Sequence, residues 1–293
     1  MAERALQLGP DGHLVGVLSS PGAVPEPANA IAARPAVLFL NAGVIHRVGP
    51  HRLHVILARR LAARGVTCLR LDLSGIGDSR SVPGALSFRQ SAVADTRSAM
   101  DWLAADTGAR RFVLFGLCSG ADNALATAAA DERVVGLVVL DPPAYATLRS
   151  RARRLVGRVR QIGDARAAVA WGVELVARRV GARVTALIAR AGRAAGSGVV
   201  DKEARTGGRE PPPIAAYRAQ LTSLVERGVQ ILTVFSGAHR ERYNHEDQLF
   251  ELFPELRGRV DRAYFPAANH VFTELEDQAL LASTVTAWME RWG

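Results

Sequence analysis

The 293-residue sequence is poor in cysteine and in long apolar runs. Its two cysteines, Cys68 and Cys118, are too few to form the disulfide framework of a small secreted protein, so each is expected to be a single thiol. No stretch contains the ~18 uncharged apolar residues that a membrane-spanning helix requires. The chain begins with MAERALQLGP, which lacks the apolar segment of a signal peptide. These absences predict a cytoplasmic protein without a membrane span.

Lysine and aromatic residues are also scarce. One of the 37 basic residues is a lysine, and aromatic residues make up 6% of the chain. Hydrophobic residues make up 48%, which is enough for a sizeable core and excludes a disordered or collagen-like chain. Because the length slightly exceeds the size at which one hydrophobic core stops growing, we expect one large α/β domain or a core with an insertion.

The positive charge is concentrated in one part of the chain. The formal net charge is +9 and the sequence pI is about 10.7, which alone would suit a protein that binds nucleic acid or an anionic membrane. Residues 149–218, however, contain sixteen basic and five acidic residues, a net charge of +11, and the rest of the chain carries −2. GC-rich codon usage alone would also produce such an arginine- and alanine-rich composition. The basicity belongs to one insertion, and we expect no nucleic-acid partner.

Short apolar runs alternate with helix-length segments along most of the chain. Residues 5–18 alternate in polarity around a Pro-Asp-Gly turn, which is typical of a β-hairpin. Buried strands are then expected at Ala36–Leu40, Val66–Leu71, Phe112–Phe115, Val134–Leu140, Ile231–Phe235 and Val260–Phe265. Most of them are separated by segments with apolar residues at helical spacing. This alternation predicts an α/β fold with a mostly parallel sheet flanked by helices.

The alternation stops after Leu140, and no clear strand follows until Ile231. The residues between them show helical periodicity. We therefore divide the chain into a core of residues 1–142 and 220–293 and an inserted helical cap, or lid, of residues 143–219. Because the cap leaves the sheet at the carboxyl end of a strand, we expect it to cover the mouth of a site at that edge.

Residues 112–123, FVLFGLCSGADN, run from a strand through Gly-x-Cys-x-Gly into a helix. This pattern is typical of a nucleophile elbow, in which the central residue has a strained backbone and the flanking glycines leave room for it. Cys118 occupies the nucleophile position, and the adjacent helix N-terminus favours its thiolate. In a competing interpretation Ser119 is the nucleophile and Cys118 a buried thiol, but the small residues would then be out of register.

Three further motifs agree with this turn. Residues 41–44, NAGV, follow the first parallel strand, where the Gly43 N–H and the Ser119 N–H would form an oxyanion hole. Residues 72–79, DLSGIGDS, form a glycine-containing loop after the second strand. His270 lies between the last strand and the final helix, and it is the expected general base.

Taken in this order, the motifs resemble those of the α/β-hydrolase family over essentially the whole chain outside the insertion. Residues 46–52, HRVGPHR, are followed by LARRLAARG, and Asn-His-x-Phe stands near the end. Together with the cysteine at the elbow, these features are similar to the exosortase-A-associated hydrolases of bacterial surface-protein and exopolysaccharide loci. The resemblance implies the α/β-hydrolase fold and a thiol-dependent acyl hydrolase or acyltransferase, without a defined substrate.

The sequence departs from the family pattern at the acid of the triad. In most α/β hydrolases this acid follows the penultimate strand, but here that strand is followed by Gly-Ala-His-Arg-Glu, which contains no aspartate. The alternatives are Glu241 and Asp141. We favour Asp141, because an acid at this position reaches the histidine in thioesterase-like and Dieckmann-cyclase-like members of the fold. The predicted triad is therefore Cys118, His270 and Asp141, in which the acid orients the histidine.

Other polar residues have ordinary structural interpretations. Cys68 lies inside a strand and is expected to be a small buried residue. The histidines at positions 46, 51 and 54 have no metal-ligand spacing and are expected at surface or capping positions. His239 and Val44 are expected to contact the substrate. No phosphate loop, dinucleotide fingerprint or paired metal ligands are present, so no cofactor or metal is predicted.

The leading hypothesis is a thioesterase-like acyl-transfer enzyme in which Cys118 forms an acyl-cysteine with an ester or thioester. Because a cysteine exchanges readily with thioesters, we favour a CoA or carrier-protein thioester, and the basic cap would suit an acidic acyl carrier protein. Two alternatives stay open. One is a Dieckmann-type cyclase that releases a carrier-bound chain as a ring. The other is a catalytically silent hydrolase-fold binding protein, suggested by the missing aspartate after Ser236.

Overall fold

The structure is a computed structural model that describes residues 1–22, 34–82, 84, 86–162 and 210–292. The chain divides into two compact units. The first contains Met1–Thr147 and Pro211–Gly293, and the second contains Leu148–Glu210. Each unit is described by itself.

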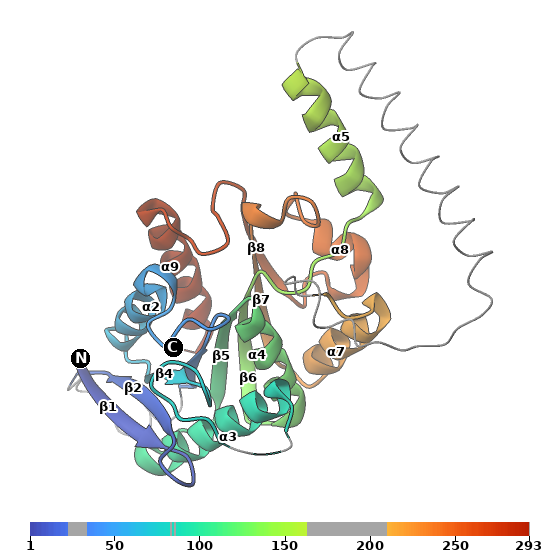
Figure 1. Cartoon of the computed structure of the whole chain (residues 1–293). Helices are drawn as coiled ribbons and strands as arrows, with labels where there is room; N and C mark the ends of the chain where they lie inside the picture. The colour runs from blue at the N-terminus through green and yellow to red at the C-terminus, as the bar shows by residue number, and fades with distance from the viewer. Residues whose placement is uncertain (23–33, 83, 85, 163–209, 293) are drawn as a thin grey trace. The chain divides into compact units, whose positions relative to one another are not determined.

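The first unit is built on an eight-stranded sheet with the order β1-β2-β4-β3-β5-β6-β7-β8 (Figure 1). The six strands from β3 onward are parallel to one another, and β2 pairs antiparallel with both β1 and β4. The strands are β1 Ala2–Leu8, β2 Leu14–Ser20, β3 Ala36–Leu40, β4 Cys68–Asp72, β5 Phe112–Leu117, β6 Val134–Leu140, β7 Gln230–Ser236 and β8 Asp261–Phe265. The predicted hairpin and mostly parallel sheet are confirmed, with strand ends displaced by up to three residues.

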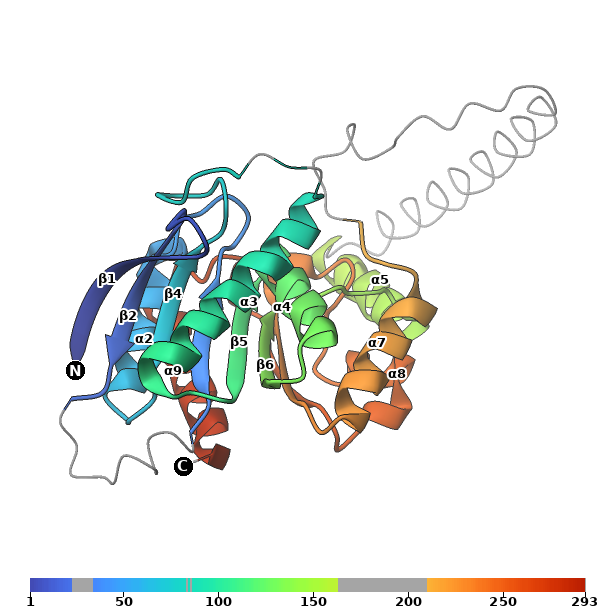
Figure 2. The ribbon, with the colours of Figure 1, turned by 90° about the horizontal axis from the view of Figure 1, so that it is seen from below.

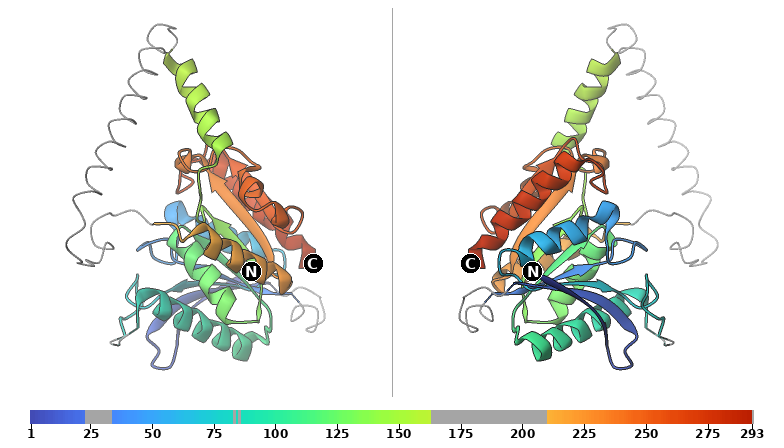
Figure 3. Two further views of the ribbon diagram at one scale, coloured as in Figure 1. Left: turned by 90° about the vertical axis from the view of Figure 1, so that its right-hand side faces the viewer. Right: turned by 90° about the vertical axis from the view of Figure 1, so that its left-hand side faces the viewer.

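Helices cover both faces of this sheet. The α-helices of the first unit are α2 Leu53–Ala62, α3 Phe88–Thr107, α4 Ser119–Ala130, α7 Ile214–Glu226, α8 Gln248–Leu252 and α9 Leu275–Met289. Short 3₁₀ helices are η1 Pro50–Arg52, η3 Gly237–His239, η4 Pro254–Leu256 and η5 Glu290–Trp292. Figure 2 looks onto the face covered by α3 and α4, and Figure 3 shows α2 beside α9 on the opposite face.

The core has two layers, one on each face of the sheet. Alternate residues of a strand belong to different layers, as the two-residue repeat of a pleated strand requires. In β3, Leu38 and Leu40 pack with residues of α3 and α4, whereas Val37 and Phe39 pack with residues of α2 and α9. All four are buried. The central strands are therefore apolar on both faces, which explains why they appear as continuous apolar runs in the sequence.

Local signals set the ends of several elements. Ser87 caps α3 through a capping box with Gln90, and the helix ends at Gly108, which has a φ of 74°. At the hairpin tip, the Gly12 N–H donates to the Gly9 carbonyl at 3.1 Å. These signals are local in sequence, so they fix the element boundaries independently of the packing.

The second unit contains α5, Leu148–Ile162. Residues 163–209 of the predicted cap lie outside the described residues, so the boundaries and role of the cap stay a prediction. No helix among the described residues is long and apolar enough to cross a membrane.

His54 corrects one expectation, because it is completely buried instead of lying at the surface. It belongs to α2, and its ring contacts Phe39 and Phe115, with ring centroids 5.5 Å away in each case. A Cβ atom on Gly49 would lie 2.6 Å from the His54 ring, so the adjacent turn packs directly on it. Burial lowers the pKa of His54 to about 3, and the Arg70 guanidinium adds to this effect.

We expect His54 to make the fold sensitive to acid. An unfolded histidine takes up a proton near pH 6.5, whereas folded His54 resists protonation to about pH 3, so its contribution to stability is complete above 6.5 and declines as pH falls between these values. In His54→Leu, the loss of unfolding free energy between pH 7.5 and 5.5 should shrink by about 1.4 kcal/mol. Urea unfolding at both pH values measures it. The exposed His46→Leu is the control, and an unchanged pH dependence in His54→Leu would contradict the prediction.

Candidate active site

Cys118 is the single residue between β5 and α4, and its backbone has a φ of 58° and a ψ of −118°. This conformation is rare for a residue with a side chain and costs roughly 1–3 kcal/mol. The turn is tightly packed. A Cβ on Gly116 would collide with the backbone of Gly120, and a Cβ on Gly120 would lie 2.6 Å from the Asn41 carbonyl oxygen. The strand, strained turn and helix thus form an elbow with Cys118 at its tip.

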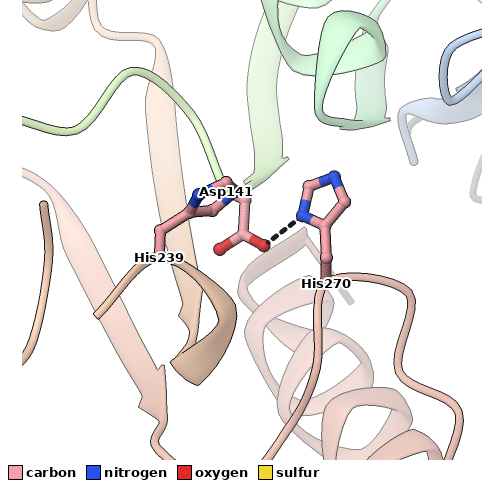
Figure 4. Close-up of side chains that lie close together, drawn as sticks. All are labelled: Asp141, His239 and His270. Carbon is pink, nitrogen blue, oxygen red and sulfur yellow. Dashed lines mark hydrogen bonds and ion pairs between the residues drawn. The ribbon is translucent and has the colours of Figure 1, made fainter. Parts of the chain in front are cut away.

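A buried carboxylate lies beside this elbow. Asp141 directly follows β6, and its side chain has no exposed surface. Its Oδ2 accepts a hydrogen bond from His270 Nδ1 at 2.7 Å (Figure 4) and another from the Ser236 hydroxyl at 2.7 Å. Its Oδ1 accepts from the Ser236 N–H at 2.7 Å. The end of β7 therefore fixes the carboxylate, and the carboxylate orients the imidazole.

His270 connects the carboxylate to the cysteine. The hydrogen bond to Asp141 raises the pKa of His270 to about 9, and a second hydrogen bond, with the Cys118 side chain, contributes in the same direction against the effect of partial burial. Because Asp141 engages Nδ1, Nε2 is the nitrogen left for the thiol. The structure thus brings Cys118, His270 and Asp141 together in the order of a nucleophile, a base and an acid.

Glu241, the other candidate for the acid of the triad, lies in a different environment from Asp141. Glu241 lies on the turn after β7 and is exposed, whereas the carboxylate bonded to His270 is that of Asp141.

His239, in η3 on the same turn, packs edge-on against His270 with ring centroids 5.0 Å apart. Asp141, His239 and His270 offer metal-ligand atoms within 4.8 Å of one another (Figure 4). A metal ion there would have to displace the hydrogen bond between Asp141 and His270.

The expected oxyanion loop lies next to the elbow. The Gly43 N–H donates to the Ser119 hydroxyl at 2.8 Å, so this donor is engaged by a side chain of the protein itself. Gly43 has a φ of 58°, in the left-handed region that favours glycine. The neighbouring Val44 is 90% exposed. The role of Gly43 in an oxyanion hole stays a prediction, and the sequence did not indicate that its N–H would be engaged by Ser119.

The oxyanion loop is held by a network that the sequence did not reveal. Asn41 donates to the Ile45 carbonyl at 2.9 Å and to Asp72 Oδ1 at 3.1 Å, and its oxygen accepts from the Leu73 N–H at 2.8 Å. Asp72 is completely buried and also accepts hydrogen bonds from the backbone and side chain of Arg47. The glycine-containing loop after the second parallel strand was the available signal, since a Cβ on Gly77 would overlap the Asp72 carboxylate.

A second set of contacts holds the His270 loop. Asn269 Oδ1 accepts from the Val271 N–H at 3.2 Å and from the Thr273 N–H at 3.1 Å. Thr273 Oγ1 also lies 3.1 Å from His51 Nε2, which joins this loop to the turn before α2. The next buried residue, Phe272, has a φ of 52°. These hydrogen bonds therefore fix the conformation of the loop that carries His270.

The family model of the alpha/beta hydrolase family matches residues 37–284. The chain belongs to this family. Membership indicates a hydrolase at the level of the superfamily. No curated protein matches the chain.

Several solved structures of the same fold are similar to the chain. An α/β serine hydrolase without a lid, from Xanthomonas campestris, is 17% identical, with a TM-score of 0.55 and coverage of 100% of this chain and 95% of the other. An esterase from Pyrococcus furiosus is 13% identical, with a TM-score of 0.55 and coverage of 99% and 91%. A serine hydrolase homologue from Coxiella burnetii is 14% identical, with a TM-score of 0.53 and coverage of 98% and 96%. These identities establish a shared fold.

The hydrogen bond between His270 and Asp141 predicts how the histidine titrates. In the wild-type protein the imidazole should titrate near pH 9, and Asp141→Asn should move the midpoint down towards the ordinary value of 6.5, because the imidazolium loses its carboxylate partner. The chemical shift of the His270 ring proton, followed by NMR across pH, measures this. Glu241→Gln is the matched control and should leave the midpoint in place. A midpoint that responds to Glu241→Gln and not to Asp141→Asn would reverse the assignment.

Proposed function

We propose that the protein is a cysteine-dependent, thioesterase-like acyl hydrolase or acyltransferase that works through an acyl-cysteine. The observation that carries the proposal is the chain of contacts from Asp141 through His270 to Cys118 at the tip of the elbow. A thiol on a strained turn at a helix N-terminus, hydrogen-bonded to a histidine that a buried carboxylate orients, has the parts required for nucleophilic catalysis.

In the first half of the reaction, Cys118 attacks the substrate carbonyl carbon as a thiolate, and its proton is already held on His270 Nε2, because the imidazole is protonated below about pH 9. The resulting oxyanion is stabilised by the Ser119 N–H and, once the Ser119 hydroxyl has moved, by the Gly43 N–H. As the carbonyl re-forms, the bond to the leaving thiolate or alkoxide breaks and His270 returns the proton to it. The product is an acyl-cysteine.

In the second half, His270 Nε2 takes a proton from water or from an acceptor alcohol, amine or thiol. That nucleophile forms a bond to the acyl carbon, and the bond to Cys118 breaks. Asp141 keeps Nδ1 protonated and stabilises the imidazolium in both halves. Water gives a free acid, and another acceptor gives acyl transfer, so the same residues serve either outcome.

A thioester is the favoured substrate. Exchange between a thiol and a thioester breaks one carbon–sulfur bond and forms another. The transfer of an acyl group from a thioester to Cys118 therefore involves little change in bond energy. His239 packs against His270, and Val44 is the exposed neighbour of Gly43; both are proposed to contact the acyl group or its leaving group. The basic charge of residues 149–218 suits a phosphate-bearing CoA or an acidic carrier protein.

Trapping of the acyl-enzyme tests this function. Incubation with a panel of acyl thioesters should add the mass of one acyl group to the intact protein, and Cys118→Ala should abolish the addition. Cys68→Ala is the matched control, because Cys68 is completely buried and burial raises the pKa of its thiol. It should leave the adduct intact.

Each of the other possible outcomes identifies one of the two alternative functions. A cyclised product without free acid would identify the Dieckmann-type cyclase. Neither adduct nor turnover dependent on Cys118 and His270, across the whole panel, would overturn the proposal and leave the catalytically silent binding protein.

The engaged Gly43 N–H leads to a prediction about Ser119. The Ser119 oxygen, 2.8 Å from this donor, occupies the place that a substrate oxygen would take and must leave before the oxyanion binds. Because a neutral hydrogen bond contributes about 0.5–1.5 kcal/mol, Ser119→Ala should raise kcat/KM for a thioester by about two- to tenfold. Steady-state kinetics measures it, with Ser283→Ala, an exposed helix position, as control. A tenfold fall would instead show that the hydroxyl itself stabilises the transition state.

A further inference from the structure

Helix α5 has an unusual composition for part of an enzyme. Its fifteen residues, Leu148–Ile162, include six arginines and no acidic residue. The apolar residues Leu148, Leu155, Val156 and Val159 recur at spacings of three, four and seven residues, so they share one face of the helix. Their exposed fractions are 84%, 45%, 50% and 42%, respectively. The helix therefore presents an apolar stripe to solvent.

Arginines border this stripe on both sides. At 100° per residue, Arg151 and Arg158 fall along one edge of the stripe, and Arg149 and Arg153 fall along the other. An arginine side chain can extend its apolar stem along such a stripe while its guanidinium reaches outward to an anion. Both edges thus carry positive charge at similar distances from the apolar centre.

We propose that α5 binds the surface of an anionic membrane and lies in the plane of its lipid headgroups. A narrow apolar stripe with arginines on both edges, on a helix whose remaining surface is largely polar, is the pattern of an interfacial helix, which buries its apolar face at the boundary of headgroups and acyl chains. The arginines along both edges would meet lipid phosphates at one depth. The proposal stands independently of the acyl-cysteine chemistry.

Two observations favour a membrane over an acidic protein partner. The charge is split between the two edges and separated by the apolar stripe, so a flat surface can engage both edges while it takes up the stripe. The helix also has no acidic side chain that would fix the register of a protein partner by pairing with the partner's basic residues. An anionic bilayer needs no such register.

Vesicle sedimentation with the full-length protein tests the proposal. The protein should sediment with vesicles of mixed phosphatidylglycerol and phosphatidylcholine, and not with vesicles of phosphatidylcholine alone. The double variant Arg151→Gln/Arg153→Gln should weaken binding by about 25-fold, since each arginine near an anionic surface contributes about fivefold. Leu155→Gln/Val159→Gln should weaken binding by about tenfold or more, because the stripe no longer enters the apolar layer.

Matched variants in the first unit separate this helix from general effects. Arg89→Gln/Arg110→Gln removes the same charge from two exposed positions outside α5. Leu280→Gln removes an apolar side chain of α9 that is 57% exposed. Both variants should bind anionic vesicles within about twofold of wild type. Circular dichroism of each variant checks the fold.

Any of the following results would overturn the proposal. One is absence of binding, or equal binding to both kinds of vesicle. Another is wild-type binding by Leu155→Gln/Val159→Gln, which would show electrostatic adsorption without insertion of the stripe. The last is a combination of two results: Leu155→Gln/Val159→Gln unfolds, and Arg151→Gln/Arg153→Gln binds vesicles as the wild type does. This combination would show that the apolar stripe packs inside the protein. Binding to an acidic carrier protein but not to anionic vesicles would assign the helix to a protein partner instead.

Discussion

The buried carboxylate of Asp141 is the interaction on which the arrangement of the site depends. A carboxylate without exposed surface is very costly unless hydrogen bonds compensate for the lost water. Here the Ser236 N–H, the Ser236 hydroxyl and His270 Nδ1 supply three. They tie the end of β6, the end of β7 and the loop before α9 to one point. The position of His270 relative to Cys118 is therefore set by the same bonds that make this buried charge tolerable.

Features encoded by local sequence were predictable. The hairpin, the parallel strands and the elbow follow from turn residues, apolar runs and the spacing of glycines around Cys118, and all were located to within three residues. The adjacency of Asp141 and His270 was also anticipated, but from the resemblance to known hydrolases. Sequence spacing alone could not choose between Asp141 and Glu241, because the choice depends on how β6 and β7 end beside each other in the sheet.

Features that depend on distant contacts were missed. His54 was expected at a surface or capping position, yet Phe39 and Phe115, from two strands, enclose it. The pairing of Arg47 with Asp72 joins a loop to the end of β4, 25 residues away, and neither segment alone indicates it. The same holds for the bond between Gly43 and Ser119, which depends on the oxyanion loop and the elbow lying side by side.

The isolation of the two thiols has a consequence for oxidation chemistry. Cys118 is partly exposed at the elbow, whereas Cys68, the other cysteine of the chain, is completely buried in β4. A sulfenic acid formed on Cys118 by peroxide thus has no accessible second thiol in the same chain with which to condense into a protective disulfide. Further oxidation leads to the irreversible sulfinic and sulfonic acids, so preservation of this thiol depends on reductants supplied from outside the protein.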